Sequence, residues 1–388
     1  MNRLRLPLFA LGLAAVLPSA NVTAQPAPVK AHAALVHCVA VSPDGKTLAT
    51  AGFDNAIKLW DIAADGSIKE KKVLAGHTGP VYAVAFHPTD AKVIVSASQD
   101  KTARIWDLTD GKMKFELKGH TDIVDTIAFS PDGKSLATAG ADKAVKLWNP
   151  ADGKELKSLG VHDGSVYAVA FSPDSKLLAS AGAGKDNLVK VWDVKEQKEL
   201  TQLKGHEQPV TAVAFTDNDL IVTASMDRTI RTWTTKEPKK DTKDTKEPKK
   251  DTPDGKEPKK DAKDAKEPPK KDAKDTKDPK DAKEPKKDAK DMKDAKEPAK
   301  EMKDPKELKK FGPTSDDPYA IAWSPVTKTV AVCGYSGQVT VWTLTGDKPT
   351  FTRAIKNPGY CIAFTADGKS VITGHDNGTV AVTPVAGK

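Results

Sequence analysis

Short apolar runs alternate with turn sequences along most of the chain, and their lengths favour β-strands over helices. Val81–Phe86 and Val166–Phe171 are apolar runs, and each is followed by a turn. The turn Ser42–Gly45 combines a proline, which presets φ, with a glycine, which accepts a positive φ. Val145–Trp148 mixes apolar and polar residues as a half-covered strand does. The pattern predicts an all-β chain of short strands.

These strands recur in a repeated segment that begins with Gly-His and ends with a tryptophan. The matching tryptophans recur at a nearly constant interval and are Trp60, Trp106, Trp148, Trp192 and Trp233. The gap from Trp233 to Trp342 is much longer, but it shrinks to one further interval of this kind once the segment 236–305 is set aside. A seventh copy begins near Tyr360, and we expect Val382 to stand at its tryptophan position.

A repeat of this period, with this start and end, resembles the WD40 family of β-propellers. Seven copies imply a seven-bladed WD40-type β-propeller with four strands in each blade. Residues 25–235 then hold blades one to five, and residues 306–388 hold the end of blade five and blades six and seven. Because the seventh copy has only three strands, we expect residues 25–31 to supply its fourth strand, which removes an open sheet edge.

The resemblance also implies a hydrogen-bonded network in each blade, which joins an aspartate, the Gly-His histidine, the tryptophan and a strand hydroxyl. The matching residues are His32, Asp54, Trp60, His77, Asp100, Trp106, His120, Asp142, Trp148, His162, Asp186, Trp192, His206, Asp227 and Trp233. Buried polar groups need partners, so we interpret this set as structural and not as catalytic or metal-binding. Blade six has Ser336 at the aspartate position, and blade seven keeps Asp376 but lacks Gly-His and tryptophan. We expect these two blades to be the least rigid.

In the WD40 family, two positions in each blade face the partner at the top of the ring. The first series is His37, Tyr82, Asp125, Tyr167, Thr211, Tyr319 and Tyr360, and the second is Phe53, Gln99, Ala141, Lys185, Met226, Tyr335 and His375. All five tyrosines fall in these series, and tyrosine supplies the rigid amphipathic surface that interfaces favour. We expect this face to bind a protein or peptide. The alternative is that the rings only pack between blades.

The segment 1–24 has the pattern of an export signal. Arg3 and Arg5 precede the apolar run Leu6–Leu17, which is short for a membrane span, and Val22–Ala24 fits a cleavage site. We therefore expect a periplasmic or secreted protein that starts at Gln25, with no membrane span in the mature chain. An uncleaved anchor is the alternative.

Residues 236–305 form a low-complexity insertion of Lys, Asp, Glu and Pro repeats. The segment holds 25 Lys and 21 Asp or Glu, a net charge of +4 within a chain of +8, and no aromatic residue. It has too little apolar surface to offset its chain entropy, so we expect disorder. Because Lys306–Gly312 resembles Lys154–Gly160, the insertion should lie between the third and fourth strands of blade five. We interpret it as a spacer or as a weak binder of anionic envelope polymers; so balanced a charge disfavours nucleic acid.

The sequence contains few features that indicate an enzyme. There is no Gly-rich phosphate loop, no GxSxG and no CxxC, and no His, Cys and Glu cluster has metal-ligand spacing. We expect no catalysis, no cofactor and no metal. An enzyme site at the channel mouth, with His37, Asp125 and His375, is a second alternative.

Three cysteines remain in a chain that is expected to be exported. Cys38 and Cys361 match each other in neighbouring blades, so a disulfide across the ring closure is one prediction. Three buried thiols, with Cys333 in an alanine-sized position, are the other.

Overall fold

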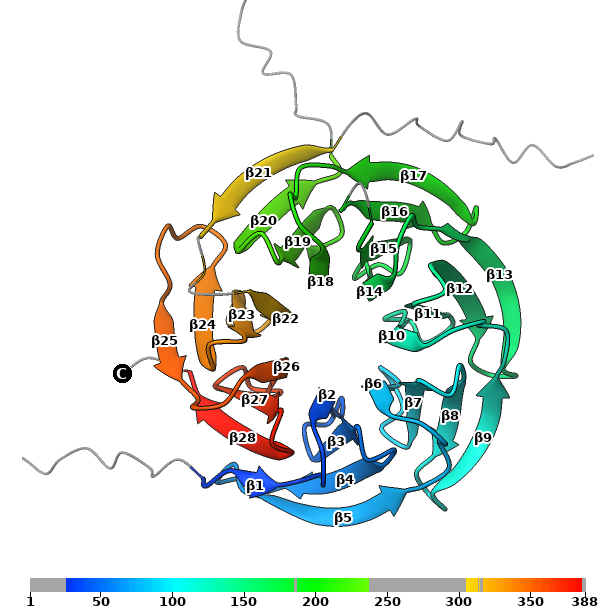
Figure 1. The fold of residues 1–388 in the computed structure, drawn as a ribbon, viewed down its shortest axis with the longest axis vertical. Helices are drawn as coiled ribbons and strands as arrows, with labels where there is room; N and C mark the ends of the chain where they lie inside the picture. Colours follow the sequence, from blue (N-terminus) through cyan, green and yellow to red (C-terminus); the bar gives the residue numbers. More distant parts are fainter. Residues whose placement is uncertain (1–25, 185–186, 237–304, 313, 315–316, 386–388) are drawn as a thin grey trace, which may run out of the picture. The chain divides into compact units, whose positions relative to one another are not determined.

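The structure, a computed structural model, describes residues 26–184, 187–236, 305–312, 314 and 317–385. Within these residues the chain forms 28 β-strands and no helix. The strands are grouped in seven four-stranded sheets, which stand as blades around a common centre (Figure 1). The predicted seven-bladed β-propeller is confirmed.

Blades one to three follow one another along the chain. Blade one consists of β2 (Val36–Val41), β3 (Thr47–Gly52), β4 (Ile57–Ile62) and β5 (Ile68–Leu74). Blade two consists of β6 (Val81–Phe86), β7 (Val93–Ser98), β8 (Ala103–Asp107) and β9 (Lys112–Leu117). Blade three consists of β10 (Val124–Phe129), β11 (Leu136–Gly140), β12 (Ala144–Asn149) and β13 (Lys154–Val161).

The remaining blades repeat this antiparallel order. Blade four consists of β14 (Val166–Phe171), β15 (Leu177–Gly182), β16 (Val189–Asp193) and β17 (Lys198–Leu203). Blade five consists of β18 (Val210–Asp217), β19 (Leu220–Ser225), β20 (Thr229–Thr234) and β21 (Lys306–Phe311). Blade six consists of β22 (Pro318–Ser324), β23 (Thr329–Gly334), β24 (Gln338–Thr343) and β25 (Phe351–Ala354). Blade seven consists of β26 (Gly359–Phe364), β27 (Ser370–His375), β28 (Thr379–Pro384) and β1 (Val29–Lys30).

The first described strand closes the ring. β1 pairs antiparallel with β28, with Val29 opposite Val380. The amides of Ala31 and His32 both donate to the carbonyl of Gly378, at 2.8 and 3.0 Å. The beginning and the end of the propeller are thus joined in one sheet.

Blade five is built from two distant stretches of sequence. β20 pairs with β21, with Ile230 opposite Phe311. The chain therefore leaves blade five after its third strand and returns as its fourth, which is the predicted point of insertion. Residues 237–304 themselves, and the predicted signal segment 1–24, lie outside the described residues.

The turn between the first two strands of a blade follows from its sequence. In blade one the Gly45 amide donates to the Ser42 carbonyl at 2.8 Å, and Gly45 has φ of 71°. The Asp44 carboxylate accepts a hydrogen bond from the Lys46 amide at 3.1 Å. Glycine tolerates this left-handed conformation, which closes a tight hairpin and fixes the register of β2 and β3.

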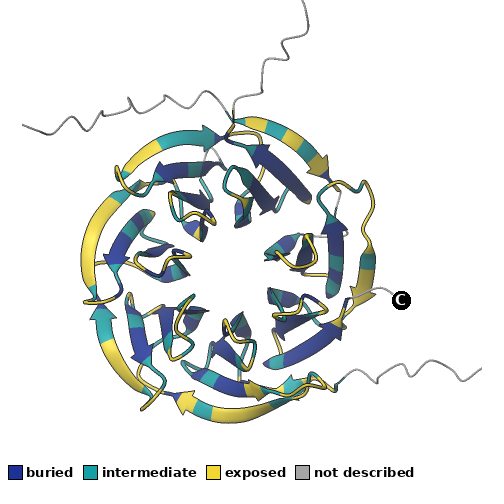
Figure 2. Ribbon diagram, turned by 180° about the vertical axis from the view of Figure 1, so that it is seen from behind, coloured by how far each residue is buried: buried dark blue, intermediate teal, exposed yellow. Residues whose placement is uncertain are grey.

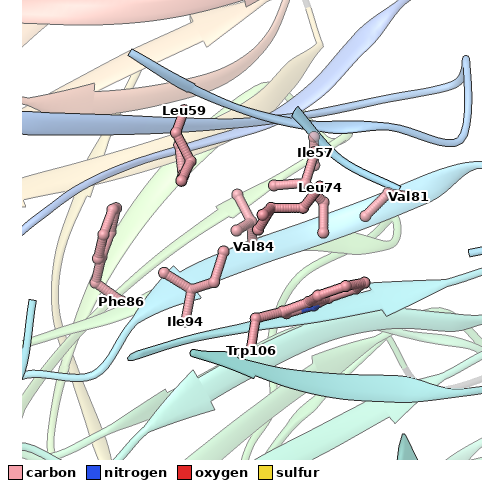
Figure 3. Close-up of a cluster of buried hydrophobic side chains, with 10 residues drawn as sticks. Ile57, Leu59, Leu74, Val81, Val84, Phe86, Ile94 and Trp106 are labelled. Carbon is pink, nitrogen blue, oxygen red and sulfur yellow. The ribbon is translucent and has the colours of Figure 1, made fainter. Parts of the chain in front are cut away.

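The core lies between neighbouring blades, because each tryptophan packs against the preceding blade. Trp106 of blade two lies in one cluster with Ile57, Leu59 and Leu74 of blade one (Figure 3). Trp60 likewise packs with blade seven. The inner strands are largely buried and the outermost strands exposed (Figure 2). Seven such inter-blade layers hold the innermost strands around the centre.

Candidate functional site

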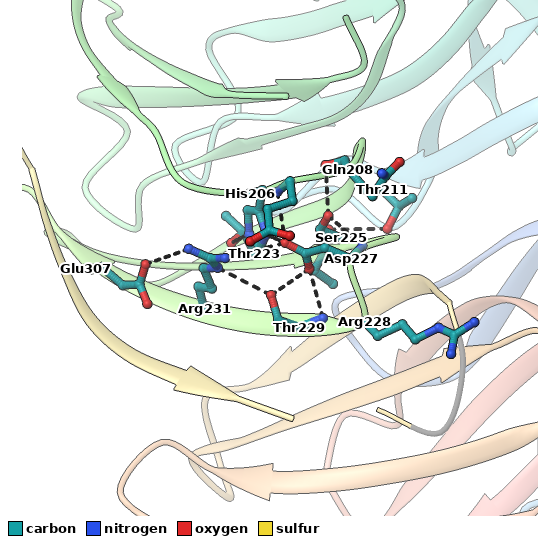
Figure 4. A network of polar contacts seen from close by, with 12 residues as sticks. His206, Gln208, Thr211, Thr223, Ser225, Asp227, Arg228, Thr229, Arg231 and Glu307 are labelled. Atoms are coloured by element: carbon teal, nitrogen blue, oxygen red, sulfur yellow. Dashed lines mark hydrogen bonds and ion pairs between the residues drawn. The ribbon is translucent and has the colours of Figure 1, made fainter. Parts of the chain in front are cut away.

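A chain of hydrogen bonds crosses the interior of blade five. Trp233 Nε1 donates to Thr223 Oγ1 at 2.9 Å, and this hydroxyl lies 2.7 Å from His206 Nε2 (Figure 4). His206 Nδ1 lies 2.8 Å from Asp227 Oδ2. An indole N–H can only donate and a carboxylate only accepts, so a neutral ring with its proton on Nδ1 completes the chain.

The same four groups meet in blades one, two and three. Their members are His32, Thr50, Asp54 and Trp60; His77, Ser96, Asp100 and Trp106; and His120, Thr138, Asp142 and Trp148. In blade four, Ser180 Oγ lies 2.7 Å from His162 Nε2 and accepts from Trp192 Nε1 at 2.8 Å. Asp186, the predicted fourth member, lies outside the described residues.

Burial favours the neutral ring in the networks of blades four and five. Burial lowers the pKa of His206, and burial together with Lys190 lowers the pKa of His162 to about 4. Burial opposes ionisation of Asp227, but hydrogen bonds from Thr229 and His206 hold its pKa at about 2. Groups that titrate so far from neutrality suit a structural role better than proton transfer near pH 7.

Blade six lacks most of this network. Val332 stands where the other blades carry the hydroxyl, since it faces Ile321 as Thr50 faces Val39. The Trp342 Nε1 atom is buried and has no hydrogen-bond partner among the described residues. Blade six thus keeps the indole and leaves its donor unsatisfied.

The strand register corrects our alignment of blade seven by one residue. Val371 pairs with Thr383, as Leu48 pairs with Trp60, so Thr383 and not Val382 occupies the tryptophan position. The hydroxyl position falls on Thr373, which faces Ile362 as Thr50 faces Val39. Matching the two threonines would have given this register from the sequence.

The aspartate position of blade seven shifts with it. The Asn377 Oδ1 atom accepts from the amide and hydroxyl of Thr379, at 3.0 and 2.7 Å, as Asp100 does from Thr102. Asn377 therefore takes the place that we gave to Asp376. Asp376 then falls at the blade-seven position of the second series, in place of His375, and is exposed.

His375 was wrongly placed on the partner-facing surface. Its residue is 1% exposed, and Nε2 lies 3.0 Å from the hydroxyl of Thr373. Its Nδ1 lies 3.3 Å from the Pro358 carbonyl. His375 lies within β27, and its imidazole contacts the hydroxyl of blade seven. In blades one to five, the corresponding imidazole comes from the segment before the first strand.

The seven residues of the first series share a feature that the sequence did not reveal. In blade two Val81 faces Ser98 and Ala83 faces Ala97, so Tyr82 is the extra residue of a β-bulge. The innermost strand of every blade has a bulge at this point, and the bulged residues are His37, Tyr82, Asp125, Tyr167, Thr211, Tyr319 and Tyr360. A bulge re-aims a side chain away from the regular alternation of a strand. One irregularity, repeated seven times, therefore turns this series to the centre.

All seven bulged residues line one cavity, of about 450 Å³, at the centre of the ring. The rest of its wall is small and mostly apolar, with residues such as Ala83, Val84 and Ile127. Of the described members of the second series, only Met226 joins the lining. The cavity thus has an apolar wall with a few polar groups, as ligand pockets do.

Two aromatic groups stand on either side of the ring closure. His37 stacks on Phe53 with centroids 5.4 Å apart, and Tyr82 lies 4.8 Å from His37 and 4.9 Å from Phe53. Tyr319 and Tyr360 stack at 4.9 Å with an interplanar angle of 15°. The rings of His37, Tyr82, Tyr319 and Tyr360 therefore pack against neighbouring rings and also line the cavity, while partner binding by this series stays a prediction.

The second series is more dispersed. Tyr335 is 63% exposed and Gln99 is also exposed, whereas Phe53 and Ala141 are half-buried. Lys185 lies outside the described residues. The described members of this series thus do not converge on one cavity as the first series does.

Asp125 and His37 differ in their electrostatics. Burial, with repulsion from Asp122 and Asp142, raises the pKa of Asp125 to about 7. Burial lowers the pKa of His37, whose Nδ1 donates to the Tyr82 carbonyl at 2.7 Å. Near neutral pH the cavity therefore holds a neutral imidazole and a carboxyl group poised to ionise.

The structure distinguishes the two predictions for the cysteines. Cys38, Cys333 and Cys361 are all free thiols; Cys333 and Cys361 are buried as predicted, whereas Cys38 is half-buried. Cys333 Sγ lies 3.4 Å from the Gly359 carbonyl oxygen, and Cys361 Sγ lies 3.7 Å from that of Val36. Burial raises the pKa of Cys38 and Cys361. Within the described ranges, no three His, Cys, Asp or Glu side chains gather in a way that would hold a metal ion.

No helix in the described part of the chain is long and apolar enough to cross a membrane.

Comparison with known proteins identifies the repeat. The family model described as WD40: WD domain, G-beta repeat matches residues 25–61, 68–107, 111–149, 153–193, 197–234 and 305–343. The matches end before β26, in keeping with the divergent network of blade seven.

Three curated proteins match the chain over short segments. The chain is 44% identical to Coronin-7 of Bos taurus over 95 residues, which are 23% of this chain and 10% of that protein. It is 35% identical over 86 residues to Nuclear distribution protein PAC1 of Komagataella phaffii, covering 22% of this chain and 17% of that protein. It is 35% identical over 103 residues to small ribosomal subunit protein RACK1y of Oryza sativa subsp. japonica, covering 26% and 29%. The chain thus spans less than a third of the length of these relatives.

With its repeats matched along more than half of the sequence and its seven blades closed into a ring, the chain belongs to the WD40-repeat family of β-propellers, a scaffold-type fold for protein interaction.

Proposed function

We propose that this chain is an exported, non-catalytic scaffold that binds a protein or peptide through the mouth of its central cavity. The observation that carries the proposal is the convergence of seven bulged side chains, four of them tyrosines, on one apolar-walled cavity of about 450 Å³. Concave sites with aromatic walls and few polar groups favour specific recognition.

Exposure of the tyrosines supports a binding role beyond packing. Tyr167 is 40% exposed although it lines the cavity, and Tyr335 of the second series is 63% exposed. A ring that served packing alone would gain by full burial of its apolar area. These rings keep part of that area available to a partner.

A catalytic site at the cavity is the second candidate, and the pKa of Asp125 near 7 is the observation in its favour. A general base must lie within hydrogen-bond reach of the group it activates. Among the described residues no hydroxyl, thiol or imidazole is hydrogen-bonded to the Asp125 carboxyl. Binding is therefore the function that this geometry supports better.

Affinity capture from an exported fraction tests the proposal with three forms of the mature protein. These are the wild type, a form without residues 236–305, and a form with Tyr82, Tyr167, Tyr319 and Tyr360 changed to Ala, each first shown to fold by circular dichroism. We expect one partner to be lost only from the tyrosine variant. Loss only on deletion of residues 236–305 would instead make the insertion, as a binder of anionic envelope polymers, the working element.

Export is part of the proposal and has its own test. The support is the charged and apolar pattern of residues 1–24. Cell fractionation followed by N-terminal sequencing should find the protein outside the cytoplasm with Gln25 as its first residue. Detection of the protein in the cytoplasm with Met1 retained would refute export. It would not affect the proposal that the cavity is the binding site.

A further inference from the structure

Asp125 is the one carboxylate in the described lining of the cavity. Its neighbours on the ring of bulged residues are Tyr82 in blade two and Tyr167 in blade four. The charge of Asp125 is felt by the Tyr82 phenol, whose pKa is raised by burial and by Asp125. The carboxylate thus lies in an aromatic part of the wall.

Among the residues that the structure describes, the Asp125 carboxylate has no counter-charge. No ion pair joins Asp125 to a lysine, arginine or histidine among the described residues, and the nearby charged groups that influence it, Asp122 and Asp142, are acidic. Two described lysines of the adjoining turns are engaged elsewhere. Lys101 Nζ donates to the Thr121 carbonyl at 2.9 Å, and Lys143 Nζ donates to the Asp163 carbonyl at 2.9 Å.

Partial burial of the ionised Asp125 carboxylate destabilises the folded state, and no ion pair among the described residues offsets this effect. The six other bulged positions are uncharged at neutral pH, since they hold four tyrosines, a threonine and the buried His37. A neutral residue at position 125 would have a smaller desolvation penalty in the folded state. A cation bound beside the carboxylate would offset this penalty. The carboxylate and the faces of the aromatic rings both attract positive charge, and the apolar wall can pack against the alkyl part of a basic side chain.

Resting on the function proposed above, we infer that the cavity mouth receives one protonated basic side chain of a partner peptide, an arginine or a lysine, with Asp125 as its counter-charge and Tyr82 and Tyr167 as flanking rings. The cavity volume of about 450 Å³ lies in the range of pockets that enclose a small ligand group. The remaining tyrosines then contact the peptide around the inserted side chain.

Tyrosine-selective NMR tests the inference on the full mature chain, which has only five tyrosines. The protein is labelled with ¹³C in the tyrosine rings, and signals are assigned with single Tyr→Phe variants. The probes are three acetylated and amidated pentapeptides, Gly-Gly-X-Gly-Gly, where X is arginine, lysine or the neutral arginine analogue citrulline. Tetramethylammonium serves as a small cation without a peptide.

We expect the arginine or lysine peptide to shift the Tyr82 and Tyr167 signals saturably, with at least about tenfold higher affinity than the citrulline peptide, the ratio that one charge-assisted contact of about 1.4 kcal/mol gives. Asp125→Asn should remove this preference while the variant keeps the wild-type circular dichroism spectrum. Equal affinity for the citrulline and arginine peptides, or an unchanged preference in Asp125→Asn, would overturn the inference. Tetramethylammonium bound as tightly as the peptides would overturn the assignment to a peptide.

The capture experiment separates this inference from the proposed function. Because Asp125→Asn leaves all tyrosines in place, a partner that the asparagine variant retains and the tyrosine variant loses would refute the cation site and preserve the binding face. A partner lost from both variants supports both claims. A partner that neither variant loses refutes both.

Discussion

The strand hydroxyl is the central group of the networks in blades one to five, because it accepts from the indole and reaches the imidazole. Thr223→Val would leave the Trp233 Nε1 donor and the His206 Nε2 acceptor buried without a partner. We expect a loss of about 1 to 3 kcal/mol in the free energy of unfolding, measured by denaturant titration. Thr201→Val in the outer strand β17, where the side chain is half-buried, is the control and should change little. Equal effects at the two positions would contradict the role of the network.

Asp125 should lower stability at neutral pH. Its pKa rises from the usual 3.8 to about 7 on folding, so the folded state binds more protons than the unfolded state between these values. Stability therefore falls as pH rises from about 4 to about 7, and the cost persists above that range. We expect Asp125→Asn to be more stable than wild type at pH 8, by about 1 to 2 kcal/mol after allowance for partial hydration, and little different at pH 4. A melting-temperature difference that does not vary with pH would contradict this.

The innermost strands show how an element positions a site. A regular strand alternates its side chains between two faces, and the bulge between Val81 and Ala83 interrupts that alternation at Tyr82. The alternating pattern and the turns predicted the strands, and the tryptophan repeat with its resemblance to the WD40 family predicted the blade number and the ring closure. They did not reveal the bulges, because a bulge depends on the pairing of two strands and not on composition.

Blade seven shows the limit of alignment by motif. The segment Gly374–Asn377 matches Gly52–Asn55 letter for letter at three of four positions, which led to placing His375 on the surface. The ladder instead aligns Thr373 with Thr50. The buried hydroxyl governs the register because its loss would leave polar groups unpaired inside the blade. The unpaired state of Asp125 was likewise invisible, since it depends on what folds around it.

In blade six, the role of the network can be tested by restoring the missing hydroxyl. Val332 is 4% exposed and stands at the hydroxyl position, while the Trp342 indole has no described partner. Val332→Thr should supply the missing acceptor and raise the free energy of unfolding by up to about 1 kcal/mol, whereas Val330→Thr, 3% exposed on the same strand, should lower it. Chemical denaturation of both variants decides the point. If both are destabilised alike, the unsatisfied indole does not weaken blade six.

Ring closure depends on a short contact between distant ends of the chain. β1 contributes two residues to blade seven, and the amides of Ala31 and His32 extend the contact to Gly378. Deleting residues 25–31 exposes the β28 edge and should lower the melting temperature by about 5 °C or more, measured by differential scanning calorimetry. The control is the chain that begins at Gln25. Coincident melting curves would show that closure does not rest on this strand.

The most direct test of partner binding at the cavity mouth is site-specific photo-crosslinking in the exporting cell. A benzophenone amino acid replaces Tyr167, which lines the cavity and is 40% exposed, or Leu156 in the outer strand β13, which is 46% exposed. The two positions offer similar exposure on different parts of one propeller. We expect one defined protein adduct from position 167 and none from position 156. The same adducts from both positions, or an adduct from position 156 alone, would contradict it.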